Sequence, residues 1–176
     1  MKLLARVLAA LQSANVTHAL IGAGAMAVHG VSRATVDLDL LTTDASVLDS
    51  SGWDELRRGG VDVEVRHGDF EDPLAGVVRL RAPGDRSVDV IVGLHPWQQS
   101  IVERAELLAL EGMVLPVVRA ADVVLLKLFA GGIQDAWDVE QLLASGDREA
   151  LSAEVEERLT DLPPECRALW RKIRSR

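Results

Sequence analysis

Three aspartates lie in strand-like segments of the sequence and could do chemistry together. Asp37 and Asp39 alternate with leucines, and this period of two predicts a strand with both carboxylates on one face. Two carboxylates side by side repel each other unless a cation lies between them, and an oxygen-only ligand set favours Mg²⁺ or a similar hard ion. Asp89 interrupts the apolar run 88–92, where an unpaired carboxylate is costly, so we expect a metal ion or another partner beside it.

If the three carboxylates meet on one sheet, they match two-metal phosphoryl transfer. One Mg²⁺ ion, or Mn²⁺ in its place, lowers the pKa of an attacking hydroxyl, and a second holds a triphosphate and neutralises the leaving group. The structural alternative is that Asp37 and Asp39 form only the solvated face of an edge strand.

A glycine turn precedes the acidic strand. Backbone N–H groups of Gly22, Ala23 and Gly24, at the start of a short helix, can bind phosphate oxygens. Gly22, Gly24 and Ala27 also satisfy the dinucleotide-binding pattern G-x-G-x-x-A. Only residues 25–35 separate this turn from the next strand, which is too short for the helical crossover of a dinucleotide-binding unit. A tight turn without a ligand is the remaining alternative.

Lys127 lies in the least polar helical segment, where its ammonium group needs a counter-charge. A triphosphate or a site aspartate would provide one; the alternative is a lysine that extends from the helix edge to solvent. Asp135 and Asp138 lie three residues apart on one side of a helix, and either orient Lys127 or cap that helix. Arg33, just before the acidic strand, could reach phosphates as a forked donor.

Periodicity, glycines and prolines predict the elements that hold these residues. We expect strands over 18–21, 36–41, 61–66, 76–81, 87–92 and 113–118, and helices over 1–12, 25–29, 96–110 and 121–144, with two more after 147 separated by Pro163 and Pro164. A turn over 82–85 joins two strands into a hairpin, and Gly131-Gly132 breaks the helix over 121–144. Strands in the middle and helices at the ends predict the α+β class.

Composition limits the classes of function. The chain has 176 residues, 48% of them hydrophobic, which excludes intrinsic disorder, and its net charge of −8 argues against a sequence-blind nucleic-acid coat. Cys166 is the only cysteine, which excludes an intramolecular disulfide and a four-cysteine zinc site. The opening segment fits an amphipathic helix better than a signal peptide, and no apolar run approaches the length of a membrane span. We therefore expect a cytoplasmic protein without a membrane partner.

The order of these motifs resembles the nucleotidyltransferase superfamily typified by DNA polymerase β, and most of all its small prokaryotic AbiEii-type, toxin-related branch. The likeness extends from about residue 16 to residue 144. It rests on ALIGAGAMAVHG at 19–30, RATVDLD at 33–39, the later Asp89, and DVVLLK at 122–127 followed by DAWD at 135–138. It implies a nucleotidyltransferase domain over 1–145, with a central mixed sheet flanked by helices, and a helical tail over 146–176.

The resemblance also implies roles for individual residues. Asp37, Asp39 and Asp89 would bind the metal ions and act in catalysis together with Lys127, and Asp89 would lie beside the acceptor hydroxyl. The phosphate-binding set would be Gly22, Ala23, Gly24, Arg33, Thr35 and Lys127. Asp135 and Asp138 would support these residues without contacting the phosphate. The family usually has glycine or serine where this chain has Ala23, so a serine hydroxyl is missing here.

The expected activity is Mg²⁺-dependent transfer of a nucleoside monophosphate from an NTP to an acceptor hydroxyl. The acceptor would be tRNA, another RNA or a protein, as for the toxin of a toxin–antitoxin pair with its antitoxin partner. Three alternatives stay open: an antibiotic-modifying nucleotidyltransferase, a non-catalytic nucleotide- or protein-binding module, and a dinucleotide-binding protein.

Overall fold

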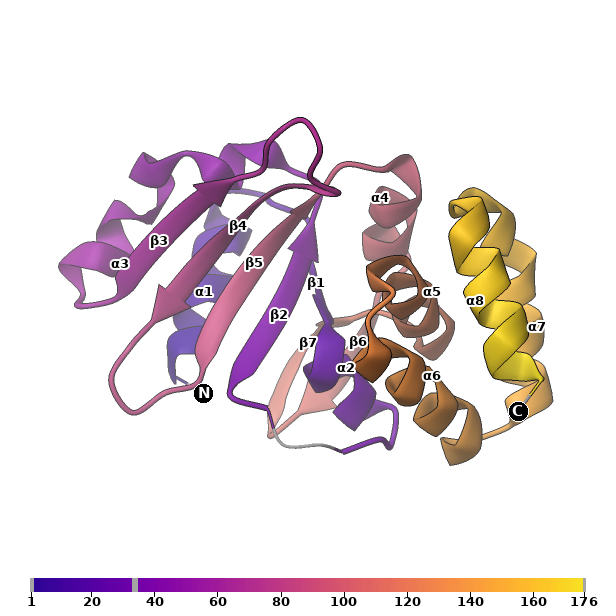
Figure 1. The fold of residues 1–176 in the computed structure, drawn as a ribbon. Helices are drawn as coiled ribbons and strands as arrows, with labels where there is room; N and C mark the ends of the chain where they lie inside the picture. Colours follow the sequence, from indigo (N-terminus) through magenta and orange to yellow (C-terminus); the bar gives the residue numbers. More distant parts are fainter. Residues whose placement is uncertain (1, 33–34, 176) are drawn as a thin grey trace.

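The computed structural model describes residues 2–32 and 35–175, which form one mixed sheet and its covering helices (Figure 1). The strands are β1 (Ala19–Ile21), β2 (Asp37–Thr42), β3 (Asp62–His67), β4 (Leu74–Arg81), β5 (Ser87–Gly93), β6 (Glu106–Leu110) and β7 (Met113–Val117). The α-helices are α1 (Lys2–Ser13), α2 (Gly22–Val28), α3 (Asp54–Arg58), α4 (Pro96–Glu103), α5 (Ala120–Ala130), α6 (Ile133–Ser145), α7 (Arg148–Arg158) and α8 (Pro164–Arg174). Short 3₁₀ helices are η1 (Ala45–Leu48), η2 (Ser50–Trp53) and η3 (Leu159–Asp161). Of the helices in the described ranges, none has the length and apolar character needed to cross a membrane.

The sheet has the strand order β3-β4-β5-β2-β1-β7-β6, and this confirms the α+β prediction with a central mixed sheet. β2 pairs parallel with β5, and β1 pairs parallel with β7, while the other neighbours are antiparallel. Since β2 lies between β5 and β1, its aspartates do not belong to an edge strand. β1 and β2 are antiparallel, so the glycine turn between them does not open the parallel crossover of a dinucleotide-binding unit.

The two faces of β2, β5 and β4 differ in chemistry because their residues alternate. One face is apolar and fully buried; it includes Leu38, Leu40, Val78, Leu80, Val88 and Val90. The amphipathic helix α1 packs against β5 on this side, and Figure 1 shows it behind the sheet. The opposite face, toward the viewer in Figure 1, carries the charged residues and is covered much less.

The C-terminal half forms a group of helices beside the sheet. α5 contacts α2, α6, α7 and α8, and Figure 1 shows α5 to α8 together on one side, away from β3 and β4. The predicted break at Gly131-Gly132 is confirmed, because α5 ends at Ala130 and α6 begins at Ile133. Gly131 has a φ of +69°, a left-handed conformation that glycine adopts without steric cost.

One predicted helix is wrong in its second half. The helix expected over 96–110 ends at Glu103, and residues 106–110 form β6, which pairs antiparallel with β7. The turn between them consists of Glu111 and Gly112, which have φ values of +48° and +83°. Two consecutive left-handed residues make a turn that suits a two-residue hairpin, and the hairpin replaces the end of the helix.

A substitution at Gly24 tests the tight packing of α2 on the sheet. A Cβ atom there would lie 3.1 Å from Leu20 Cδ1 and 3.3 Å from Leu38 Cδ2. We expect Gly24→Val to lower the free energy of unfolding by about 1–3 kcal/mol, because the added methyl groups overpack the core. Urea unfolding measures the change, and Gly146→Ala, where a Cβ meets no atom within 4 Å, is the control. Equal stability of the two variants would contradict the packing.

Candidate active site

The three predicted carboxylates lie on one face of two neighbouring strands. In the parallel pair of β2 and β5, Asp39 is opposite Asp89, and Asp37 is opposite Ser87. Paired residues on adjacent strands point to the same face, and residues two apart on a strand do so as well. The register therefore brings Asp37, Asp39 and Asp89 together on the sheet face opposite α1.

Arg79 of β4 holds the third carboxylate. It is opposite Asp89 in the antiparallel β4–β5 pair, and its Nε donates to Asp89 Oδ1 at 2.9 Å and to Oδ2 at 3.1 Å. Nη2 of Arg79 also donates to Asp89 Oδ2, which makes the pair forked. These hydrogen bonds, and then the charge of Asp89, raise the pKa of Arg79, with smaller contributions from the charges of Asp37 and Glu64. A half-exposed guanidinium group thus neutralises an almost buried carboxylate.

The glycine turn lies directly against the acidic strand. Gly22 has a φ of +62°, and a Cβ atom there would meet Asp39 Oδ2 at 2.3 Å. Both the backbone conformation and the nearby carboxylate therefore require glycine at this position. Ala23 and Gly24 are buried, so the methyl group of Ala23 is covered by protein. Gly22 is the half-exposed residue of the three.

The donor set fits a hard divalent cation at two of the three carboxylates. Asp37 and Asp39 are half-buried neighbours on one strand face and offer only oxygen atoms. Asp37 also accepts a hydrogen bond from the Ser87 hydroxyl. Asp89 does not fit as a third ligand while both of its oxygens accept from Arg79. In agreement, no group of three His, Cys, Asp or Glu side chains within 2–32 and 35–175 is arranged to hold a metal ion.

Thr35 shapes the entry to β2. Its hydroxyl donates to the carbonyl oxygen of Asp37 at 2.9 Å, and the N–H of Asp37 lies 3.3 Å from the same hydroxyl. This local turn positions Asp37, and the predicted contact of Thr35 with phosphate stays a prediction. The predicted phosphate ligand Arg33 lies outside the described residues.

Lys127 is held between two carboxylates of α6. Its Nζ lies 2.9 Å from Asp135 Oδ1 and 2.6 Å from Asp138 Oδ2, and Lys127 and Asp138 are both buried. The lysine thus does not extend to solvent. Asp135 Oδ2 also accepts the N–H of Gly132 at 3.1 Å, so Asp135 both orients Lys127 and caps α6. These ion pairs join α5 to α6, and a role of Lys127 in phosphate binding stays a prediction.

Sequence reasoning missed three residues that hold the acidic groups in place. Arg79 and Ser87 contact Asp89 and Asp37, and Arg104 makes a forked pair with the buried Asp122, with Nε 2.9 Å from Oδ2. Arg79 alternates with apolar residues of β4, and this alternation predicts the sheet face on which Arg79 lies. It does not predict which residue pairs with Arg79. The residue opposite Arg79 depends on the register of the hairpin.

Solved structures provide the comparison that identifies the fold. The antibiotic-resistance factor ANT(2″)-Ia, a nucleotidyltransferase, aligns in its solution structure with a TM-score of 0.60, 14% identity and coverage of 90% of each chain. Its crystal structure with adenylyl-2″-tobramycin aligns with a TM-score of 0.57 and 12% identity, over 90% of this chain and 96% of that one. The chain has the nucleotidyltransferase fold. Neither a scan of protein-family models nor a search of curated proteins finds a match to the sequence.

A double-mutant cycle tests the contact between Gly22 and Asp39. We expect Gly22→Ala to destabilise the protein by about 1–2 kcal/mol from the left-handed backbone alone, and further through the clash with the carboxylate. In an Asp39→Ala background the contact with the carboxylate is removed and only the Cβ of residue 39, at 3.3 Å, stays close, so the cost should fall by more than about 0.5 kcal/mol. Urea unfolding of the four proteins measures this coupling. The same cost in both backgrounds would show that the carboxylate does not lie against Gly22.

The ion pairs of Lys127 predict a large effect on stability. Lys127→Met leaves Asp138 buried without its cation, and we expect a loss of about 3–5 kcal/mol in the free energy of unfolding. Adding Asp138→Asn should restore part of this loss, because the uncompensated charge is removed. Thermal and urea unfolding measure both, with Lys172→Met at an exposed lysine as the control. If Lys127→Met were as stable as Lys172→Met, Lys127 would not be the cation that stabilises buried Asp138.

Proposed function

We propose that the protein is a Mg²⁺-dependent nucleotidyltransferase that transfers a nucleoside monophosphate from an NTP to an acceptor hydroxyl. The observation that carries the proposal is the pairing of Asp39 with Asp89, with Asp37 on the same face and Gly22 directly against Asp39. The nucleotidyltransferase fold of the chain supports it.

The chain's own residues would divide the work. Asp37 and Asp39 would hold Mg²⁺, which supplies charge neutralisation and acidifies the attacking hydroxyl when bound. The backbone N–H groups of Gly22, Ala23 and Gly24 would orient the triphosphate, with Lys127 as a further predicted phosphate ligand. Asp89, once released by Arg79, would receive the proton of the acceptor hydroxyl. The acceptor oxygen then bonds to the α-phosphorus, the bond from that phosphorus to the bridging oxygen breaks, and pyrophosphate leaves.

Two acceptor classes follow from different observations. The motif order, which resembles AbiEii-type proteins, favours tRNA, another RNA or a protein, with the chain as a toxin that has an antitoxin partner. The fold shared with ANT(2″)-Ia, solved with adenylyl-2″-tobramycin, favours an antibiotic hydroxyl. Both require the same reaction at the same carboxylates.

A transfer assay tests the proposal. Purified protein is incubated with Mg²⁺, each α-labelled NTP in turn, and either total RNA, tobramycin or no added acceptor. We expect label in RNA, in tobramycin or on the protein itself, and a loss of roughly 100-fold or more in Asp39→Asn, because charge neutralisation at the phosphate is removed. Chelation of the metal should abolish transfer.

Asp62→Asn is the matched control, since Asp62 lies on the same sheet but at an exposed position of β3. It should keep the wild-type rate. Magnesium-dependent NTP binding without transfer would indicate that the protein is a non-catalytic nucleotide-binding module and not a transferase. Absence of NTP binding would contradict the nucleotide hypothesis itself.

A further inference from the structure

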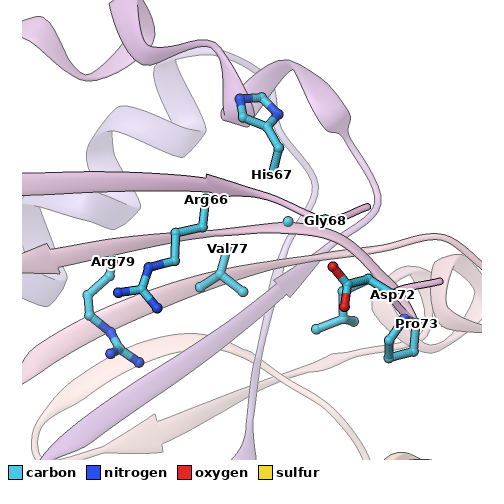
Figure 2. Close-up of a pocket in the computed structure, with 9 residues that line it drawn as sticks. Arg66, His67, Gly68, Asp72, Pro73, Val77 and Arg79 are labelled. Atoms are coloured by element: carbon cyan, nitrogen blue, oxygen red, sulfur yellow. The ribbon is translucent and has the colours of Figure 1, made fainter. Parts of the chain in front are cut away.

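A cavity of 420 Å³ opens on β3 and β4. Arg79, which pairs with Asp89, forms part of its lining. Its lining includes Arg66, Asp72, Pro73, Leu74, Val77 and Arg79. Figure 2 shows Arg66, Val77 and Arg79 pointing to one side of the two strands. Arg66 is opposite Val77, and Arg79 is opposite Asp89, so these side chains share the face of the carboxylates.

Arg79 connects this cavity with the candidate active site. Its guanidinium group accounts for the hydrogen bonds to both Asp89 oxygens, and its side chain is still 38% exposed. Only the arginine end of this pair is exposed: the Asp89 side chain is 8% exposed, so turning Arg79 away with no replacement donor would leave a buried carboxylate uncompensated, which is costly. An oxyanion in the cavity can therefore take over Arg79 only when another donor replaces it at Asp89, and the hydroxyl of an acceptor bound there would supply that donor.

The arginine side chains of the cavity indicate the class of ligand. The charged residues of its lining are Arg66 and Arg79, which carry guanidinium groups, and Asp72, which carries a carboxylate. Arg66 also pairs with Glu64, but its side chain is 68% exposed and can turn to a ligand. Forked guanidinium groups suit phosphate oxygens and, because they only donate hydrogen bonds, offer no acceptor to the ammonium groups of an aminoglycoside.

We propose that this cavity binds a phosphate group of the acceptor, next to the hydroxyl that receives the nucleotide. The inference rests on the proposed function, and it deepens it by naming a phosphate-bearing acceptor in place of a polycationic one. Binding of the phosphate to Arg66 and Arg79 couples acceptor occupancy to release of Asp89. The third carboxylate then becomes available only when an acceptor is present.

The experiment measures binding without NTP or metal. Wild type, Arg66→Met and Arg81→Met are titrated with ribose 5-phosphate, ribose and tobramycin, and the Nε–H resonance of Arg79 is followed by NMR. Arg81 is the matched control, because it lies on the same face of β4 and is exposed but does not line the cavity. We expect ribose 5-phosphate to shift the Arg79 resonance and to bind roughly tenfold more weakly to Arg66→Met, the effect of one lost charge-assisted hydrogen bond. Arg81→Met should bind within about twofold of wild type.

Several results would overturn the inference. The first is that ribose 5-phosphate binds no more tightly than ribose, and the second is that Arg66→Met and Arg81→Met weaken its binding equally. The third is that tobramycin shifts the Arg79 resonance, and the fourth is that Mg-ATP competes with ribose 5-phosphate and displaces it. A short oligoribonucleotide in place of ribose 5-phosphate separates the sources of phosphate: tighter binding indicates an RNA end, and equal binding a small phosphorylated acceptor.

The two proposals fail in different ways. If the transfer assay shows no activity but ribose 5-phosphate binds as expected, the cavity is a phosphate site independent of the proposed reaction. If transfer occurs but Arg66→Met binds like wild type, the nucleotidyltransferase proposal stands and the acceptor inference falls.

Discussion

Repulsion between carboxylates on neighbouring strands is the constraint on which the candidate site depends. Adjacent strands lie about 4.8 Å apart, so Asp39 and Asp89, opposite each other in the β2–β5 pair, place two negative charges within one strand spacing. Asp37 adds a third charge on the same face. Protein groups offset part of this repulsion, because Arg79 forks onto Asp89 and the Ser87 hydroxyl donates to Asp37. A cation between Asp37 and Asp39 would offset the rest.

The topology makes this arrangement available. The β3–β4 hairpin precedes β5 in the chain, and β5 then pairs parallel with β2, so Arg79 and the β2 carboxylates lie on opposite sides of Asp89. The apolar face under α1 keeps the register, since a shift by one residue would move every aspartate into the core. Gly22 completes the site because a larger residue would collide with Asp39. The charged face is thus a consequence of a well-packed apolar one.

The sequence predicts those features that follow from a single residue's own properties. Alternation of aspartate and leucine placed Asp37 and Asp39 on one face, and the conformational freedom of glycine predicted the break after α5. Register could not be predicted. A two-residue turn centred on Pro83 and Gly84 would place Arg79 opposite Val88, but the observed pairing places Arg79 opposite Asp89. That difference of one residue depends on packing across the sheet, and it decides whether Arg79 reaches the carboxylate.

The Glu111-Gly112 turn did carry a local signal for the β6–β7 hairpin, and helical spacing in 96–110 obscured it.

The most direct test of the account is a crystal structure of the protein with Mn²⁺ and a non-hydrolysable ATP analogue. The account predicts an anomalous peak within coordination distance of Asp37 and Asp39 oxygens, with the triphosphate against Gly22. A peak bound elsewhere, or a nucleotide bound away from the β2–β5 face, would contradict the assignment of these carboxylates as the active site.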